Sequence, residues 1–208
     1  TNKGLLVPDV TITFFGKPTT NVCLYTRKSD NIASVSGLKG KVWGGTSMVP
    51  MKYMLYKSGI KVPMKQFFSK EIFIIDENVT NVMNALLDKK IDAFALQSLQ
   101  YDMAKGSDKK YLGIQASNCI EYEHSWIFAY KKGTPPDVVE KVRNVMLNAH
   151  KDKEFQQFKF LFTAIKGHFV AFDPANLALT KEIFTLLNKN GWEKEDEAFI
   201  KAGMKNVK

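Results

Sequence analysis

The sequence of 208 residues holds only two cysteines and three histidines. The histidines belong to no His-Glu-x-x-His motif, the cysteines form no Cys-x-x-Cys pair, and no nucleophile elbow is present. The sequence therefore predicts a protein that is not an enzyme, with no catalytic residues, no metal site and no cofactor. We interpret Cys23 and Cys119, which lie in different expected strands, as buried free thiols. A disulfide stays open as the alternative, if the strands are neighbours in an oxidising compartment.

Long apolar runs are also missing. No stretch approaches the roughly 18–20 residues that a membrane-spanning helix needs. Residues 1–8 contain no apolar run of the kind that a signal peptide carries. We therefore expect a mature chain or a piece of a longer one.

Acidic residues are outnumbered, because the 30 Lys and Arg exceed the 21 Asp and Glu by nine. A basic balance favours anionic partners, from nucleic acid to small carboxylates and phosphates. The positive charge is spread in short pairs such as Lys89-Lys90, without zinc-finger spacing, an RNA-binding aromatic signature or a long basic run. We therefore expect a small anionic molecule, and not nucleic acid, as the partner.

Strand and helix patterns alternate along the first two thirds of the chain. Strands are expected over residues 9–15, 21–27, 41–43, 71–75, 91–96, 111–115 and 125–130, with a polar stretch around Asn118 between the last two. Helices are expected over residues 50–57, 79–88 and 98–104, and then almost alone over 135–150, 153–164, 174–188 and 194–205. This order predicts the α/β class, with parallel units joined by right-handed crossovers and a helical tail that covers a sheet already built.

The segment Lys41-Val-Trp-Gly-Gly-Thr-Ser-Met-Val-Pro50 carries the first candidate site. An expected strand runs into two glycines and two hydroxyl residues, and then into a helix whose free N–H groups and dipole favour an anion. Glycine lets a ligand approach the backbone, and hydroxyl groups add hydrogen bonds. The candidate ligand-binding residues are Gly44, Gly45, Thr46, Ser47 and Met48. A simple strand–helix turn, capped by Thr46 or Ser47, fits the same residues equally well.

A second candidate follows the strand expected to end at residue 96. Ligands in open α/β sheets bind outside the carboxyl ends of strands, and Gln97 and Ser98 occupy that position. Both side chains can form hydrogen bonds with a polar ligand. Ordinary capping of the following helix by Ser98 explains this residue equally well.

Three segments resemble one protein family. They are Asn21-Val-Cys-Leu-Tyr-Thr-Arg-Lys-Ser-Asp30 with Val35-Ser-Gly-Leu-Lys-Gly-Lys-Val42, then Asn81–Ala93, and then Phe128–Val142, which contains Gly133-Thr-Pro-Pro-Asp-Val-Val139. They are similar to the hinge, a helix–turn–strand unit and the return segment of type II periplasmic solute-binding proteins. The last segment is most similar to the Bug-type receptors of tripartite tricarboxylate transporters. The resemblance spans about residues 9–193.

The resemblance implies a two-lobed fold like that of periplasmic binding proteins, with mixed sheets flanked by helices. We expect residues 1–39 and 123–208 to form the first lobe and residues 40–122 to form the second. It also implies a periplasmic or extracellular monomer that captures a small anion, with a carboxylate favoured, for membrane transporter components. The loop that matches Gly44–Met48 holds the ligand in such receptors.

Two alternatives remain within the same fold. Sensing domains of membrane receptors share this fold and act on a receptor signalling domain. Phosphonate-type and sulfonate-type binding proteins share the Leu38-Lys-Gly-Lys41 turn.

Family members also begin with further strands and helices of the first lobe, including a glycine-rich ligand loop. This chain opens at Thr1 and reaches the strand expected at 9–15 at once. We therefore expect that half of the family's ligand site is missing from this sequence or is built differently.

Overall fold

The computed structural model describes residues 5–75, 79–124, 126–158, 163 and 166–205, which divide into two compact units. Unit 1 comprises residues 1–20 and 123–181, and unit 2 comprises residues 21–122 and 182–208. Unit 2 therefore includes two segments that we expected in the first lobe, residues 21–39 and 182–208. The first segment belongs to unit 2 because its strand pairs within the sheet of that unit. The second belongs there because the last helix of the chain packs on the same sheet.

A five-stranded sheet forms the centre of unit 2. Its strand order is β4 (Lys70–Phe73), β3 (Val42–Gly45), β5 (Ala93–Gln97), β2 (Thr19–Arg27) and β6 (Ile114–His124). Strand β3 is parallel to both β4 and β5, whereas β2 is antiparallel to β5. The sheet is therefore mixed, as the sequence predicted, and the α/β class is confirmed.

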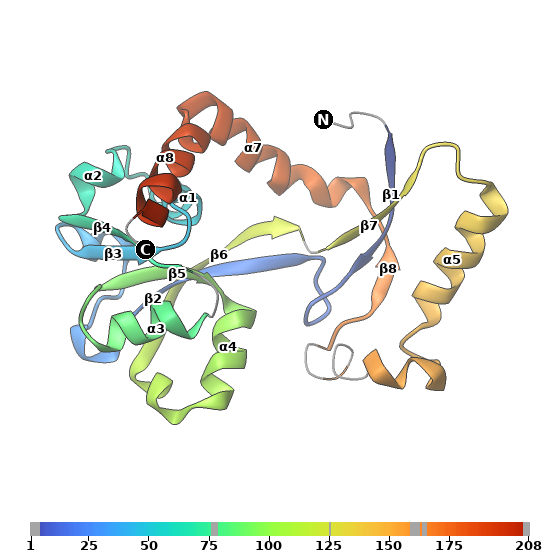
Figure 1. The fold of residues 1–208 in the computed structure, drawn as a ribbon, viewed down its shortest axis with the longest axis horizontal. Helices are drawn as coiled ribbons and strands as arrows, with labels where there is room; N and C mark the ends of the chain where they lie inside the picture. The colour runs from blue at the N-terminus through green and yellow to red at the C-terminus, as the bar shows by residue number, and fades with distance from the viewer. Residues whose placement is uncertain (1–4, 76–78, 125, 159–162, 164–165, 206–208) are drawn as a thin grey trace. The chain divides into compact units, whose positions relative to one another are not determined.

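Helices cover both faces of this sheet (Figure 1). They are α1 (Val49–Lys57), α2 (Met64–Phe67) and α8 (Trp192–Lys205) on one face, and α3 (Thr80–Leu87) and α4 (Ser98–Ser107) on the other. Successive side chains of a strand point to opposite faces, so Leu24 packs with the first group and Tyr25 with the second. Both faces are apolar, which explains why the strands read as nearly continuous hydrophobic runs.

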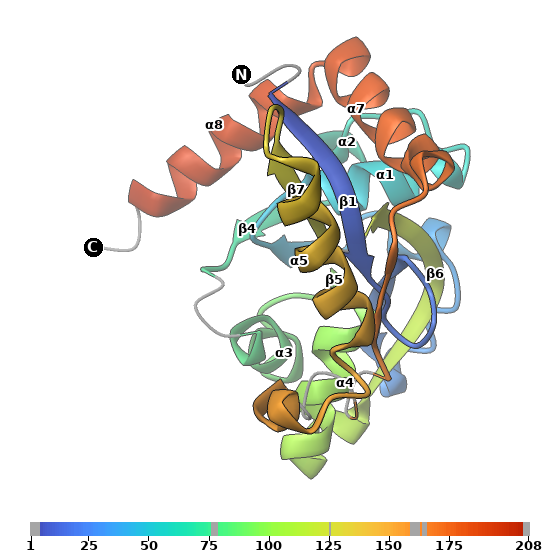
Figure 2. The same ribbon diagram turned by 90° about the vertical axis from the view of Figure 1, so that its right-hand side faces the viewer.

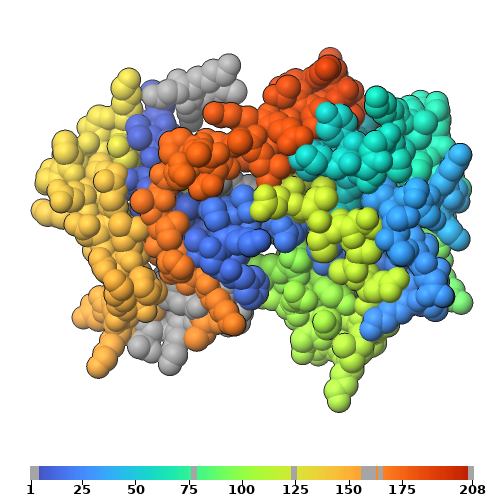
Figure 3. Space-filling model, turned by 180° about the vertical axis from the view of Figure 1, so that it is seen from behind, coloured from blue at the N-terminus to red at the C-terminus, as the bar shows by residue number. Residues whose placement is uncertain are grey.

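Unit 1 contains a three-stranded antiparallel sheet. Strand β1 (Leu6–Ile12) lies between β7 (Ile127–Lys131) and β8 (Phe169–Ala171). Helix α5 (Pro136–Asn148) packs across β1 and β8 (Figure 2), and the Nε of Arg143 donates to Asp9 at 2.6 Å. The other side of α5, drawn in yellow to orange in Figure 3, is at the surface. Helix α7 (Ala178–Asn190) begins in unit 1 and ends in unit 2.

Short elements account for most differences from the expected pattern. The 3-10 helices are η1 (Lys28–Asp30), η2 (Val35–Leu38), η3 (Lys109–Gly113), η4 (Lys153–Phe158) and η5 (Pro174–Leu177). Strand β8, which lies in the region expected to be almost only helical, is too short for its pattern to be recognised. The helix expected over residues 153–164 is the 3-10 helix η4 in its first half, and its residues 159–162 and 164 lie outside the described residues. Ser125, the first residue of the strand expected over 125–130, also lies outside them.

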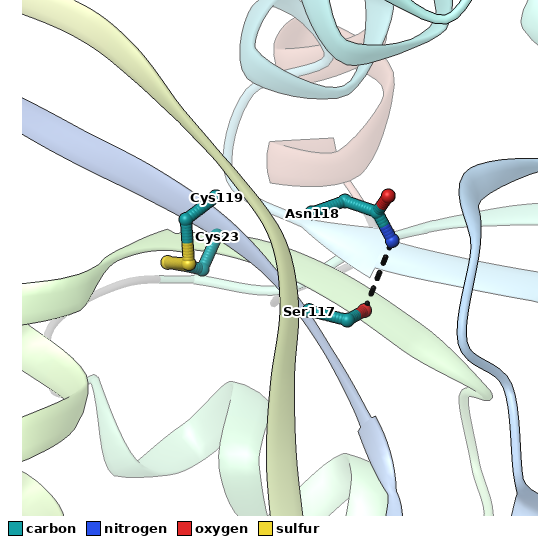
Figure 4. Close-up of a disulfide and its surroundings, with 4 residues drawn as sticks. All are labelled: Cys23, Ser117, Asn118 and Cys119. Carbon is teal, nitrogen blue, oxygen red and sulfur yellow. Dashed lines mark hydrogen bonds between the residues drawn. A yellow bond between two sulfur atoms is a disulfide. The ribbon is translucent and has the colours of Figure 1, made fainter.

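Strand β6 corrects the expected break around Asn118. Residues 111–113 belong to η3, and one strand of 11 residues then passes through the polar stretch. Asn118 has a φ of 47°, a left-handed conformation that asparagine tolerates, and its side chain bonds the hydroxyl of Ser117 (Figure 4). The polar stretch is therefore an irregularity within a strand and not a loop between two strands.

The cysteines are joined, which corrects the interpretation of Cys23 and Cys119 as free thiols. Their disulfide links β2 to β6 across a Cα–Cα distance of 4.0 Å (Figure 4). The two strands are neighbours in the sheet, which is the structural condition of the alternative. Cys23 is buried, whereas Cys119 is exposed to solvent.

The guanidinium of Arg27 ties the end of β2 to the next elements of unit 2. One of its terminal nitrogens donates to the carbonyls of Leu86 and Ile91, at 2.7 and 2.6 Å, and its other terminal nitrogen donates to Asp92 at 2.6 Å. The second carboxylate oxygen of Asp92 accepts from the N–H of Val42. Burial alone would raise the pKa of Asp92, but the N–H of Val42 and the guanidinium together hold it below its usual value.

Candidate anion-binding site

The loop between β3 and α1 lies at the carboxyl end of a parallel strand, as expected. Strand β3 ends at Gly45, and the first helical hydrogen bond of α1 runs from the N–H of Lys52 to the carbonyl of Met48 at 2.9 Å. Pro50 follows Val49 in the first turn and contributes no N–H. The N–H groups of Met48 and Val49 are therefore donors that the helix itself does not use.

A carboxylate of the same chain occupies one of these donors, together with the hydroxyl of Ser47. The hydroxyl of Ser47 donates to one oxygen of Asp196 at 2.9 Å, and the N–H of Met48 donates to the other at 2.5 Å. The same hydroxyl accepts from the N–H of Val49 at 3.2 Å. The start of α1 is therefore an anion-binding arrangement, and in this structure α8 supplies the anion.

The charges around this arrangement reinforce its preference for an anion. Lys52, one turn into α1, is 5% exposed and forms an ion pair with Glu195, the residue before Asp196. Burial raises the pKa of nearby Glu71, and the Lys52 ammonium partly offsets that rise. Two consecutive acidic residues of α8 thus neutralise the two positive features of α1, its N-terminus and its buried lysine.

The two glycines of the loop have packing reasons of their own. A Cβ on Gly44 would lie 2.7 Å from the Cγ2 of Ile91, and a Cβ on Gly45 would lie 2.7 Å from the buried ring of Trp43. Real Cβ atoms essentially never approach other atoms so closely. Neighbouring side chains therefore require these glycines, whether or not a ligand approaches the backbone.

The remaining predicted residues lie at two different cavities. Thr46 and Gly45 line a cavity of about 20 Å³ together with Ala95 and Leu96 of the neighbouring strand β5. Ser98 instead lines a separate cavity of about 460 Å³ on the face of α4, with Tyr25. Gln97 ends β5 beside it. The structure thus brings Gly44 to Met48 together in one loop and directs Ser98 to another cavity.

The cavity that contains Ser98 has a polar lining of its own. Tyr25 and Tyr101 pack against each other at 4.4 Å between ring centroids, and Asp102 and Lys105 lie at the same cavity. Burial, with the Asp102 carboxylate, raises the pKa of Tyr25. The Tyr25 hydroxyl is buried and has no hydrogen-bond partner among the described residues.

A third cavity lies along the later part of α1 and the segment that follows this helix. It has a volume of about 370 Å³, within the usual range for small-ligand pockets. Its lining includes Lys52, Lys61 and Glu195, with the aromatic pair Tyr56 and Trp192 at 6.3 Å between centroids. No residue of the loop from Gly44 to Met48 lines this cavity, so it is separate from the occupied donors.

Three residues of this region escaped the sequence analysis: Lys52, Glu195 and Asp196. Asp196 lies 148 positions from Met48, and no local pattern indicates that the two meet. The one available signal is composition, because Glu193, Glu195, Asp196 and Glu197 cluster in an otherwise basic chain.

The described part of the chain contains no group of three or more His, Cys, Asp or Glu side chains placed to hold a metal ion. None of its helices combines the length and the apolar character needed to cross a membrane.

Comparison with known sequences identifies a family pattern. The pattern described as "ABC transporter, phosphonate, periplasmic substrate-binding protein" matches residues 5–177. A comparison with curated protein sequences gave no match.

Solved structures of the same architecture are numerous. A protein of Xanthomonas citri bound to chloride ion is 16% identical and has a TM-score of 0.67, with 90% of this chain and 72% of that chain covered. A binding protein component of an ABC phosphonate transporter from Pseudomonas aeruginosa is 16% identical, with a TM-score of 0.65 and coverage of 97% and 71%. PhnD1 from Prochlorococcus marinus, in complex with methylphosphonate, is 18% identical, with a TM-score of 0.65 and coverage of 88% and 72%. At these identities the likeness concerns the two-lobed fold.

Proposed function

Because this chain belongs to the family of phosphonate-type periplasmic substrate-binding proteins of ABC transporters, we propose that it captures a small phosphonate or a related oxyanion for a membrane transporter. The family consists of transport components and not enzymes, and its description places it in the periplasm. The expectations of a solute-binding role, a transporter partner and export therefore hold at this level.

The ligand class is the finer part of the proposal. The sequence analysis favoured a carboxylate through the likeness to tripartite tricarboxylate receptors, and no comparison supports that narrower likeness. The phosphonate-type alternative, which rested on the Leu38-Lys-Gly-Lys41 turn, agrees with the family match. A neighbour of the same fold was solved with methylphosphonate, which makes this compound the first to test. No structural observation favours the alternative of a receptor's sensing domain.

The observation that carries the proposal is the anion-binding arrangement at the start of α1. It already holds the carboxylate of Asp196 through the Ser47 hydroxyl and the Met48 N–H. A phosphonate group would place its oxygens on the same donors, where the helix dipole favours negative charge.

The proposed site consists of the loop residues Gly44 to Met48. Ser47 and Met48 bind the anion, Thr46 adds a hydroxyl group, and Gly44 and Gly45 keep the loop close to β3. Gln97 and Ser98 stay a prediction as residues that form hydrogen bonds with a polar ligand, and Ser98 has the weaker case because it lines another cavity.

Isothermal titration calorimetry with methylphosphonate, inorganic phosphate, methanesulfonate and succinate tests the ligand class. We expect methylphosphonate to bind and succinate to bind more weakly or not at all. The site is tested with Ser47→Asp, because aspartate is a good residue at a helix start but repels an incoming anion. This variant should lose at least about tenfold in affinity for methylphosphonate.

The matched control is Ser58→Asp, at the exposed carboxyl end of the same helix. It adds the same charge away from the donors and should leave affinity unchanged. Wild-type affinity in Ser47→Asp, with an unchanged circular dichroism spectrum, would move the site away from this loop. Succinate binding more tightly than methylphosphonate would restore the carboxylate hypothesis.

A further inference from the structure

Helix α8 is held on the anion-binding arrangement by two kinds of contact. The polar contacts are those of Asp196 with Ser47 and Met48. The apolar contacts come from Phe199, one turn further along, whose ring centroid lies 5.7 Å from that of Trp43 and 5.7 Å from that of Phe73. The carboxylate is therefore delivered by a packed helix and not by a loose chain end.

We infer that α8 is an internal competitor that occupies the ligand's anion subsite until a ligand displaces Asp196. The inference rests on the proposed function, because it concerns the same donors. A carboxylate and a phosphonate oxygen need the same N–H and hydroxyl groups, and these two donors cannot serve both anions at once. Ligand capture therefore requires α8 to release the start of α1.

The acidic pair of α8 is suited to a reversible contact. Asp196 is only partly buried, and Glu195, which pairs with the buried Lys52, is 58% exposed. Water can therefore solvate both carboxylates as soon as the helix moves away. Release leaves the buried ammonium of Lys52 without its carboxylate, a cost that an anionic ligand at the start of α1 reduces.

Competition of this kind lowers the apparent affinity by the fraction of molecules in which the subsite is open. Hydrogen bonds to charged groups each contribute enough to change an equilibrium by roughly tenfold to a hundredfold. Weakening Asp196 should therefore tighten ligand binding, whereas a residue that only stabilises the fold would leave it unchanged or weaken it.

The first experiment measures the affinity of Asp196→Asn for methylphosphonate and for inorganic phosphate by titration calorimetry. The amide keeps the size of the side chain and removes its charge. We expect affinity to rise by roughly tenfold or more. The matched control is Glu197→Gln, which removes the same charge from the next, exposed residue of α8 and should leave affinity unchanged.

A second variant weakens the packing of α8 without changing Asp196. Phe199→Ala removes ring contacts with Trp43 and Phe73 and leaves all the donors of the site in place. It should also tighten binding, because α8 is then held less firmly. This variant keeps the inference open to refutation if Asp196→Asn does not fold.

Hydrogen exchange of the wild-type protein gives a readout that does not depend on any variant. With saturating methylphosphonate, the amides of residues 192–205 should exchange faster, although ligands ordinarily slow exchange. Unchanged or slower exchange in α8, with the ligand bound, would overturn the inference.

The affinity results separate this inference from the proposed function. Equal affinity in the wild type, Asp196→Asn and Phe199→Ala would overturn the competitor role and leave the solute-binding proposal intact. Binding by Asp196→Asn alone would support the competitor role most strongly. No binding of either probe by any folded variant would overturn both.

Discussion

The disulfide between Cys23 and Cys119 stabilises unit 2 by joining two neighbouring strands of its sheet. It closes a loop of 96 residues within unit 2, from β2 to the neighbouring strand β6. The chain-entropy model assigns about 4.7 kcal/mol to a loop of about this length, and measured values are typically about 2–4 kcal/mol. Reduction should therefore destabilise unit 2 by roughly 2–4 kcal/mol.

This loss converts into a change in melting temperature. In chains of about this size, 1 kcal/mol corresponds to roughly 2–4 °C, so the melting temperature should fall by about 5–15 °C. Because Cys119 is exposed, a reductant can reach the bond in the native protein. Scanning calorimetry with and without a phosphine reductant measures the change, and the thiol count under denaturing, non-reducing conditions should be zero.

The control is the double variant Cys23→Ala with Cys119→Ala. It should melt near the temperature of the reduced wild type and should not respond to the reductant. Equal melting temperatures for the oxidised and reduced wild type would refute the reasoning. Two free thiols in the denatured protein would restore the original interpretation of buried cysteines.

Three further predictions concern the stability of unit 2. Arg27→Met removes the partner of Asp92 and leaves the carbonyls of Leu86 and Ile91 without their donor, so urea unfolding should show a loss of about 3–5 kcal/mol. Because the pKa of Asp92 is lowered in the folded protein, its contribution to the free energy of unfolding is complete above the usual aspartate pKa and is lost as the pH falls below about 4. Asp92→Asn should therefore flatten the pH dependence of stability below about pH 4. An unchanged loss of stability in acid would contradict this prediction. Gly45→Ala forces the Trp43 ring to move and should cost about 1–3 kcal/mol, whereas Gly106→Ala, where a Cβ meets nothing within 4 Å, should not show this packing loss in the same unfolding assay.

The glycine result also changes how the loop can be tested. A bulky residue at Gly45 blocks backbone approach, but it also displaces the buried ring of Trp43. Loss of binding in such a variant would therefore reflect the fold as much as the site. Ser47→Asp avoids this problem, because the Ser47 side chain lies at the anion-binding donors and not in the core.

Much of the fold was predictable because its signals are local. Most strands and helices of unit 2 were recognised from the alternation of apolar residues, and the loop from Gly44 to Met48 from its glycines and hydroxyl groups. The type II fold was recognised from the Leu38-Lys-Gly-Lys41 turn and the segment after Phe128. Short elements were missed, since β8 has only three residues and too little pattern to read. The break expected at Asn118 was wrong because a polar residue in a left-handed conformation can sit inside a strand.

The sequence by itself therefore determined the class of fold, the order of most elements and the position of the loop from Gly44 to Met48, all of which depend on neighbouring residues. The tertiary structure decided which distant residues meet. The cysteines are 96 positions apart, and Asp196 is 148 positions from Met48, so only the pairing of β2 with β6 and the packing of α8 bring them together. The donors at the start of α1 follow from local backbone geometry, but the carboxylate that occupies them depends on how the chain returns to the sheet.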